Sequence, residues 1–135
     1  MSQENVEVVH RAGEAFNRHD AEALAAMSDD DLEFLPALAS VETGGLAYRG
    51  PKAWGAYFAR MDEMWDDWRL EDLEVFDAGG DRVAAVFRLV GAGRASGVPV
   101  DHRIGLAYRF RNGKLWRMRS YLDPAEALEA VGLRE

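Results

Sequence analysis

Two side chains in this sequence have the chemistry needed to move a proton near neutral pH, Glu33 and His102. Glu33 is the only acid in the short apolar segment LEFLP (32–36), and burial among apolar neighbours would raise the pKa of its carboxyl group toward neutrality. The alternative for Glu33 is a solvated carboxylate or one paired with an arginine. A histidine titrates near pH ~6.5 and suits a general base, so His102 is the second candidate catalytic residue. Its alternative is a half-exposed strand histidine without a chemical role.

Two hydroxyl groups, those of Tyr108 and Ser120, could orient a carbonyl or hydroxyl group of a ligand. The alternative is that they bond to backbone or water, as most such groups do. Ser120 and His102 are expected on paired strands. The sequence has no strained nucleophile elbow and no clear third member, so it does not support a Ser-His-acid triad.

The sequence offers no recognisable set of metal ligands or phosphate-binding glycines. It has no cysteine, which excludes disulfides, thiol catalysis and cysteine-ligated metals. Its histidines are scattered, and the aspartates at 29–31 lack the spacing of a calcium loop. The glycines of GAGRASG (91–97) lie between expected strands and not before a helix. We therefore expect neither a metal nor a cofactor.

Length, composition and charge limit the class of protein. A chain of 135 residues with 48% hydrophobic and 30% charged residues is typical of one globular domain, here residues 1–135. No apolar run approaches the ~18 residues of a membrane span, and the N-terminus lacks the features of a signal peptide. We expect a cytoplasmic protein without a membrane partner. The net charge of -8 argues against a nucleic-acid partner.

The charge is unevenly distributed along the chain. Residues 1–78 carry 18 acids against 6 bases, whereas residues 79–135 carry 6 acids against 10 bases. We expect the basic side chains on solvated strand faces and at the rim of a dimer. A surface that binds an anion or a nucleic acid is the alternative.

The first half of the sequence predicts three helices around a short strand. Apolar residues recur with a period of 3.6 over residues 3–18, and Asp20 is suited to cap a short helix that follows. The segment 32–36 predicts a strand that ends at Pro36. A long helix is expected from Gly50-Pro51, with one apolar face made by Trp54, Tyr57, Phe58, Met61, Met64, Trp65 and Trp68. We interpret this face as core packing; a cofactor-binding aromatic box is the alternative.

From Trp68 onward the hydrophobic period changes to two, which predicts strands. The pairs Gly79-Gly80, Ser96-Gly97 and Asn112-Gly113 are typical of hairpin turns. They separate the segments RLEDLEVFD, DRVAAVFRLVGAG, VPVDHRIGLAYRF and KLWRMRSYL. Asp123 and Pro124 open a terminal helix. The predicted fold class is α+β, in the order α-α-β-α-β-β-β-β-α.

The register of the last hairpin determines which of its side chains face inward. A two-residue turn at Asn112-Gly113 would place Leu106 opposite Arg119 and so mix apolar and charged groups on one face. We therefore expect a three-residue loop at 111–113, with the pairs Phe110–Lys114, Tyr108–Trp116, Leu106–Met118 and Ile104–Ser120. Trp116, Met118 and Ser120 then face inward. The outer face carries Asp101, Arg103, Arg109, Arg117, Arg119 and Tyr121.

This arrangement resembles the nuclear transport factor 2-like cone fold over nearly the whole chain. The segments that look like its SnoaL-like branch are ENVEVVHRAGEAFNRHDAEAL, DDDLEFLP, YRGPKAWGAYFARM, GDRVAAVFRL and RNGKLWRMRSYLDPAEALEA. The superfamily includes ketosteroid isomerase, limonene epoxide hydrolase, polyketide cyclases and non-catalytic binding modules, so the fold alone does not fix the function. The resemblance implies a conical pocket between a concave sheet and the long helix.

The resemblance also implies where catalytic groups would lie, and other residue types occupy those positions. The isomerase's general-base aspartate matches Leu35, its oxyanion-hole tyrosine matches Ala12 and its oxyanion-hole aspartic acid matches Leu106. The last-strand acid of the epoxide hydrolase and the cyclases matches Ser120, and the cyclase histidine matches Met118. None of these catalytic sets is complete.

We therefore favour a non-catalytic domain whose pocket holds a small hydrophobic molecule or is filled by its own side chains. The alternative is a cofactor-independent isomerase, cyclase or hydratase that acts by proton transfer on a small hydrophobic substrate. An adaptor or oligomerisation role of the outer sheet face is a third hypothesis. The expected pocket residues are Phe34, Leu35, Trp54, Phe58, Phe87, Leu106, Tyr108, Trp116, Met118 and Ser120. We also expect a homodimer through the outer sheet face, where Gly105 and Ala107 leave room for a partner sheet.

Overall fold

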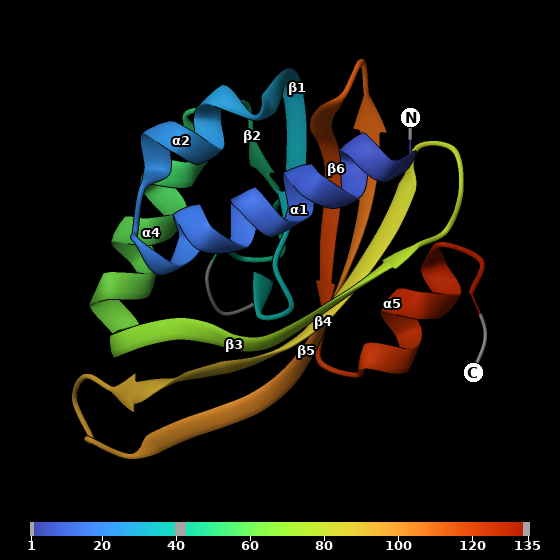
Figure 1. Cartoon of the computed structure of the whole chain (residues 1–135). Coiled ribbons are helices and arrows are strands. Elements are labelled where there is room, and N and C mark those ends of the chain that lie inside the picture. The colour runs from blue at the N-terminus through green and yellow to red at the C-terminus, as the bar shows by residue number, and fades with distance from the viewer. Residues whose placement is uncertain (1, 40–42, 134–135) are drawn as a thin grey trace.

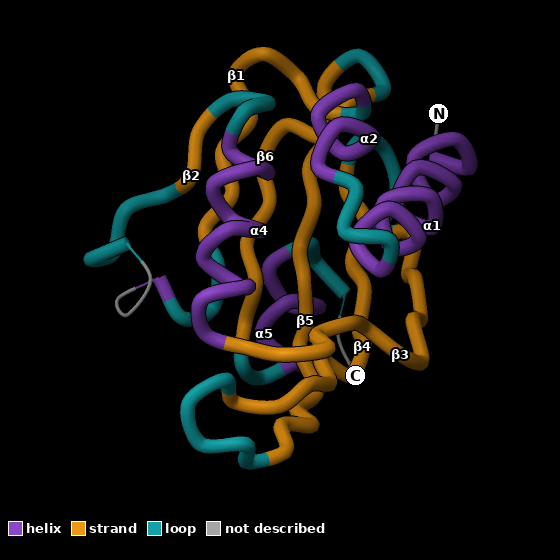
Figure 2. Tube along the Cα trace, turned by 90° about the vertical axis from the view of Figure 1, so that its left-hand side faces the viewer, coloured by secondary structure: helices purple, strands orange, loops and turns teal. Residues whose placement is uncertain are grey.

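A curved six-stranded sheet forms the frame of the protein, whose computed structural model describes residues 2–39 and 43–133. The strand order is β2-β1-β6-β5-β4-β3, and β1 and β6 are parallel while the other pairs are antiparallel. Helices α1, α2 and α4 lie on the concave side and α5 lies on the other (Figures 1 and 2). The elements are α1 (Ser2–Asn17), α2 (Ala21–Ala26), β1 (Ser28–Leu35), β2 (Tyr48–Arg49), α4 (Ala53–Met64), β3 (Trp65–Asp77), β4 (Arg82–Gly93), β5 (Pro99–Arg111), β6 (Lys114–Tyr121) and α5 (Pro124–Ala130). The predicted α+β fold is confirmed.

Helix α1 packs closely on strand β3 because the helix has a glycine, Gly13, at a contact position. It buries Val8, Val9, Ala12 and Ala15 against the core. A Cβ atom at Gly13 would lie 3.1 Å from the side chain of Leu73 on β3, so a larger residue would push the helix outward.

The predicted long helix is shorter than expected. It ends at Met64, and Trp65 already has the extended backbone of β3. Trp68 is buried on the strand, where its indole nitrogen donates to Asp62 Oδ1 at 2.8 Å. A register shift between Asp66 and Arg69 interrupts the two-residue alternation of β3 at this point. Trp68 therefore lies at a helix-like spacing from the buried residues of α4, which explains why the sequence pattern extended the helix too far.

Strand β1 begins earlier than predicted, and β2 was not predicted. The strand was expected to begin at residue 32, but β1 runs over Ser28–Leu35. Arg111 donates to Asp29 Oδ1 at 2.7 Å and to Asp31 Oδ2 at 2.8 Å, so a cation from β5 stabilises two acids at this end of β1. Strand β2 pairs with β1: Arg49 lies opposite Glu33, and Tyr48 lies opposite Phe34.

The expected register of the last hairpin is wrong. Asn112 and Gly113 form a two-residue turn with φ values of 54° and 75°, and Arg111 pairs with Lys114. A bulge then follows, so that Tyr108 lies opposite Met118 and Leu106 lies opposite Ser120. This bulge sorts apolar from charged side chains without the three-residue loop. Met118 and Ser120 keep the inward orientation, but Trp116 falls at the bulge.

Helix α5 covers part of the outer sheet face that was expected to be open. A Cβ atom at Gly105 would lie 2.7 Å from Ala127 Cβ, which means that the helix rests directly on the strand. Ala107 packs against the small cluster of Ala84, Leu128 and Val131 beneath α5. The expectation that Gly105 and Ala107 leave room for a partner sheet is therefore wrong, while the homodimer itself stays a prediction.

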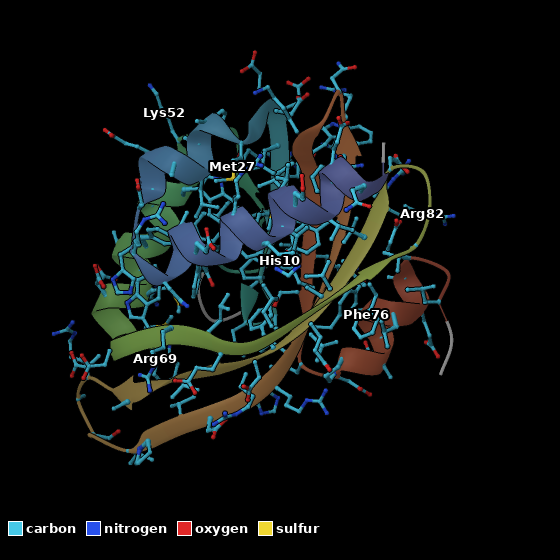
Figure 3. The ribbon with its side chains drawn as sticks, viewed as in Figure 1. His10, Met27, Lys52, Arg69, Phe76 and Arg82 are labelled. Carbon is cyan, nitrogen blue, oxygen red and sulfur yellow. The ribbon has the colours of Figure 1, made fainter. Side chains whose placement is uncertain are left out.

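The main core lies between the concave face and the three helices that cover it. It includes Val83, Ala85, Leu115, Leu32 and Met61, all of them buried. In Figure 3 the labelled side chains of Lys52, Arg69 and Arg82 lie at the periphery. In the described part of the chain, no helix is long and apolar enough to cross a membrane.

Candidate functional site

A cavity of about 300 Å³ lies between the concave face of the sheet and helices α1, α2 and α4. Its wall is almost entirely aromatic and aliphatic. The lining residues are Ala12, Gly13, Phe16, Leu24, Phe34, Pro36, Ala37, Leu38, Trp54, Tyr57, Met61, Trp65, Leu70, Phe87, Leu89, Val100, His102, Ile104, Leu106, Tyr108, Met118, Ser120 and Leu122. His102 and Leu122 are the exposed members of this set, so the cavity opens beside them.

An aromatic wall on α4 and β1 is held in place by ring packing and one buried hydrogen bond. Phe34 stacks on Trp54 with ring centroids 5.4 Å apart and meets Tyr57 edge-on at 5.0 Å. The indole nitrogen of Trp54 donates to Ser28 Oγ at 2.9 Å, and Ser28 Oγ donates to the Leu24 carbonyl at 2.7 Å. The indole N–H is therefore satisfied outside the cavity, and the ring presents an apolar face to it.

Two hydroxyl groups on neighbouring strands supply polarity to the sheet side of the cavity. Tyr108 is 4% exposed, and burial raises the pKa of its hydroxyl well above the usual value, so the phenol stays protonated. Ser120 is half-buried. Neither hydroxyl has a hydrogen-bond partner among the residues that the structure describes. The other polar lining side chains are Tyr57, Trp54, Trp65 and His102.

His102 lies at the opening of the cavity and not in its interior. Its Nε2 atom lies 3.1 Å from the carbonyl oxygen of Leu122, and the side chain is exposed. The ring therefore spans the mouth from β5 to the chain segment that follows β6. This exposed setting agrees with the alternative interpretation of a strand histidine held by a backbone contact.

Glu33 does not line the cavity. Because Phe34 points inward, its neighbours Glu33 and Leu35 point to the other face of β1. The Glu33 carboxylate accepts a hydrogen bond from Arg49 and lies 3.7 Å from an Arg117 nitrogen. This arrangement matches the alternative interpretation, an arginine-paired carboxylate, and it leaves Glu33 without access to a ligand in the cavity.

The other expected pocket residues divide into two groups. Phe34, Trp54, Phe87, Leu106, Tyr108, Met118 and Ser120 line the cavity together with His102. Leu35, Phe58 and Trp116 do not: Leu35 faces a shallow outer groove, and Phe58 packs between Phe16 and Trp68 with ring centroids 5.8 and 5.1 Å away. The Trp116 ring lies among Arg109, Arg111 and Arg117 at 5.4, 4.8 and 4.3 Å.

Sequence reasoning missed the contribution of the first helix and of the strand ends. Ala12 and Phe16 line the cavity from α1, and Leu70, Leu89 and Val100 line it from β3, β4 and β5. The apolar stripe of α1 held the signal for Ala12 and Phe16. Whether Leu70, Leu89 and Val100 reach the cavity depends on the curvature of their strands, which the sequence pattern does not encode directly.

In the described ranges 2–39 and 43–133, none of the side chains that line the cavity is a carboxylate, an ammonium or a guanidinium. The same ranges hold no group of three or more histidine, aspartate or glutamate side chains arranged around one point. The arrangement can therefore hold an apolar molecule and donate hydrogen bonds to it. Its interior provides no carboxylate for proton abstraction.

A family model for the SnoaL-like domain matches residues 9–118, which is most of the chain and includes nearly all strands that form the cavity. The protein belongs to the SnoaL-like domain family. This confirms the resemblance that the sequence segments indicated. No curated protein sequence matches the chain.

Solved structures of other proteins share the fold of this SnoaL-like domain. An NTF2-like protein of unknown function from Burkholderia pseudomallei has a TM-score of 0.79 and 20% identity, covering 96% of this chain and 98% of that one. A protein from Xanthomonas campestris with the provisional name polyketide cyclase has a TM-score of 0.76 and 23% identity, with coverages of 96% and 98%. TerC, co-crystallised with polyporic acid, has a TM-score of 0.78 and 19% identity, with coverages of 95% and 98%.

Proposed function

We propose that this SnoaL-like domain binds a small, uncharged, apolar molecule in its cavity and does not catalyse proton transfer on it. The observation that carries the proposal is the composition of the cavity wall. Its described residues are aromatic and aliphatic with a few neutral hydrogen-bonding groups, and none of them is a carboxylate, an ammonium or a guanidinium. The positions that match the family's catalytic acids hold Leu106 and Ser120 in this wall.

The physical chemistry of the wall favours an apolar ligand. Each Å² of apolar surface removed from water contributes about 25 cal/mol, so even a small hydrocarbon-rich molecule gains several kcal/mol from burial here. A charged ligand would lose its hydration without gaining an opposite charge, which is costly in an apolar site. A volume of about 300 Å³ is at the lower end of the range of ligand pockets and suits a molecule of two or three rings.

Fluorescence titration with N-phenyl-1-naphthylamine tests this proposal, because this neutral probe brightens in apolar surroundings. We expect saturable binding of one probe molecule per chain. Replacing Ala12 in the cavity wall by methionine fills part of the space and should weaken binding by about fivefold or more, since overpacking costs at least ~1 kcal/mol. Arg11→Met, at the exposed neighbouring position, should bind as the unmodified chain does.

The proposal is contradicted if the probe does not bind saturably, or if Ala12→Met binds it unchanged. Circular dichroism establishes that the variant is folded. If Ala12→Met unfolds, Ala37→Met provides the same test from a half-buried position outside the helices that also lines the cavity.

One observation favours the alternative of an enzyme: His102 lines the cavity and could act as a base on a ligand at the mouth. A neutral ketone, 2-acetylnaphthalene, exchanges the protons of its methyl group with deuterium oxide when a base removes them. We expect the same exchange rate with the protein as with buffer, measured by proton NMR. A faster rate that is lost in His102→Gln would support catalysis and contradict the proposed binding role.

A further inference from the structure

The hydroxyl group of Tyr108 is a buried donor without a partner. Tyr108 is 4% exposed and lines the cavity from the middle of β5. The hydroxyl makes no hydrogen bond with any residue that the structure describes. Its oxygen is also absent from the set of fully buried atoms without a partner, so the oxygen keeps some accessible surface. The oxygen is therefore reached by the empty space of the cavity. A buried tyrosine hydroxyl ordinarily has a partner, so this one invites a ligand atom.

The register places a second free hydroxyl beside it. Tyr108 pairs with Met118, and Ser120 is the next inward residue along β6. Diagonal neighbours of this kind lie about 7–8 Å apart, which is close enough for one small ligand to meet both side chains. Ser120 is less buried than Tyr108 and lies nearer to the mouth, where His102 and Leu122 are exposed.

The ionic groups near this part of the sheet are engaged elsewhere. Glu33 and Arg117 face each other on the outer side of the strands, and Arg109 contacts Asp81 at 3.1 Å. No cation of the described chain lines the cavity to receive a ligand carboxylate. A neutral oxygen acceptor satisfies the Tyr108 hydroxyl without bringing an unpaired charge into the apolar wall.

We propose that the cavity selects an uncharged molecule of about two rings that carries one carbonyl oxygen, and that the Tyr108 hydroxyl donates a hydrogen bond to this oxygen. The inference rests on the proposed binding function. It specifies in addition which polar group the ligand carries and which residue recognises that group. Tyr108 is then a specificity-determining residue. It distinguishes a ketone from the hydrocarbon of the same shape, because the hydrocarbon would leave the hydroxyl without a partner.

Three probes of nearly equal shape test the proposal by isothermal titration calorimetry. They are 2-acetylnaphthalene, which carries a carbonyl group, 2-ethylnaphthalene, which lacks it, and 2-naphthoate, which is charged. We expect the ketone to bind most tightly and the carboxylate most weakly. Tyr108→Phe should weaken ketone binding by about 3- to 10-fold, the usual worth of one neutral hydrogen bond, and change hydrocarbon binding by less than about twofold.

Tyr121→Phe is the matched control, because it removes a tyrosine hydroxyl at the end of the neighbouring strand without touching the cavity lining. It should leave all three affinities unchanged. Because Tyr108→Phe removes only a hydroxyl without a partner, the variant is expected to fold. If it does not, Ser120→Ala in the unmodified Tyr108 background must retain most of the preference for the ketone over the hydrocarbon.

The outcomes separate this inference from the proposed function. Equal binding of ketone and hydrocarbon to the unmodified chain would preserve the proposed function and overturn the inference. Loss of the ketone preference in Ser120→Ala, with none in Tyr108→Phe, would overturn the assignment to Tyr108. Binding of 2-naphthoate as tight as that of the ketone would overturn the requirement for an uncharged ligand. Failure of all three probes to bind would contradict the proposed function as well.

Discussion

At the scale of single residues, the side of the strand on which a polar group lies determines its chemistry. Glu33 and Phe34 are neighbours, yet one pairs with arginines outside and the other lines the cavity. The sequence could nominate Glu33 because it is the only acid of its segment. It could not assign the face, since the arginines that receive Glu33 come from β2 and β6, far away in sequence.

Replacing Glu33 by glutamine tests this placement. We expect unchanged affinity for N-phenyl-1-naphthylamine, because the carboxylate does not line the cavity. The free energy of unfolding in urea should fall by less than about 1 kcal/mol, as is usual for exposed ion pairs. A large loss of probe affinity at unchanged stability would show that Glu33 reaches the ligand after all.

The carboxyl group of Asp29 makes the stability of the fold depend on pH. Hydrogen bonds from Arg111 hold the pKa of its carboxyl group below the ordinary value of 3.8. Between the lowered folded pKa and the ordinary unfolded one, the unfolded chain binds more protons, so stability rises with pH there. The contribution of Asp29 is complete above the unfolded pKa and is lost as the pH falls through the folded pKa.

We therefore expect Asp29→Asn to be less stable than the unmodified chain at pH 7 and to lose less stability between pH 5 and acidic pH. Urea unfolding at a series of pH values measures both effects. Asp30→Asn is the matched control, since Asp30 is an exposed neighbour that receives no hydrogen bond from Arg111. If the free energy of unfolding falls by the same amount at acidic pH in Asp29→Asn and in the unmodified chain, the role assigned to Asp29 is refuted.

At the scale of elements, two bulges account for the unexpected position of Trp68 and for the wrong register of the last hairpin. The helix–strand order apart from β2, the positions of the Gly79-Gly80 and Asn112-Gly113 turns and the capped terminal helix follow from local residue chemistry and could be predicted. The bulges at 66–69 and near Trp116 could not, because they depend on which partner strand receives each residue. Each one displaces a tryptophan from the position that strict periodicity would give it.

The turn at Asn112-Gly113 sets the register that brings Tyr108 opposite Met118. Gly113 has a φ of 75°, a conformation that costs an alanine about 1–2 kcal/mol. We expect Gly113→Ala to lower the free energy of unfolding by that amount. Gly55→Ala is the contrasting variant: Gly55 lies exposed on α4 with open space at its Cβ position, so alanine there should stabilise by about 0.5–1 kcal/mol. Equal effects of the two substitutions on urea unfolding would contradict the turn assignment.

At the scale of the whole molecule, the two faces of the sheet have different roles. The concave face and three helices enclose the cavity, while α5 covers part of the outer face (Figure 1) and rests on Gly105. Seven of the ten expected pocket residues line the cavity, because a side chain's inward or outward face follows from alternation once the fold is known. The contribution of α1 depends on its close approach at Gly13, which is a property of the assembled molecule.

Methyl NMR of the methionines tests the central claim, that an uncharged apolar molecule binds inside the cone, most directly. Met61 and Met118 line the cavity, whereas Met27 and Met64 are outside its lining and serve as internal controls. On titration with 2-acetylnaphthalene we expect the methyl signals of Met61 and Met118 to shift saturably under the ring current of the ligand, while those of Met27 and Met64 stay nearly unchanged. Saturable shifts confined to Met27 or Met64, or no saturable shift at any methionine, would contradict the claim.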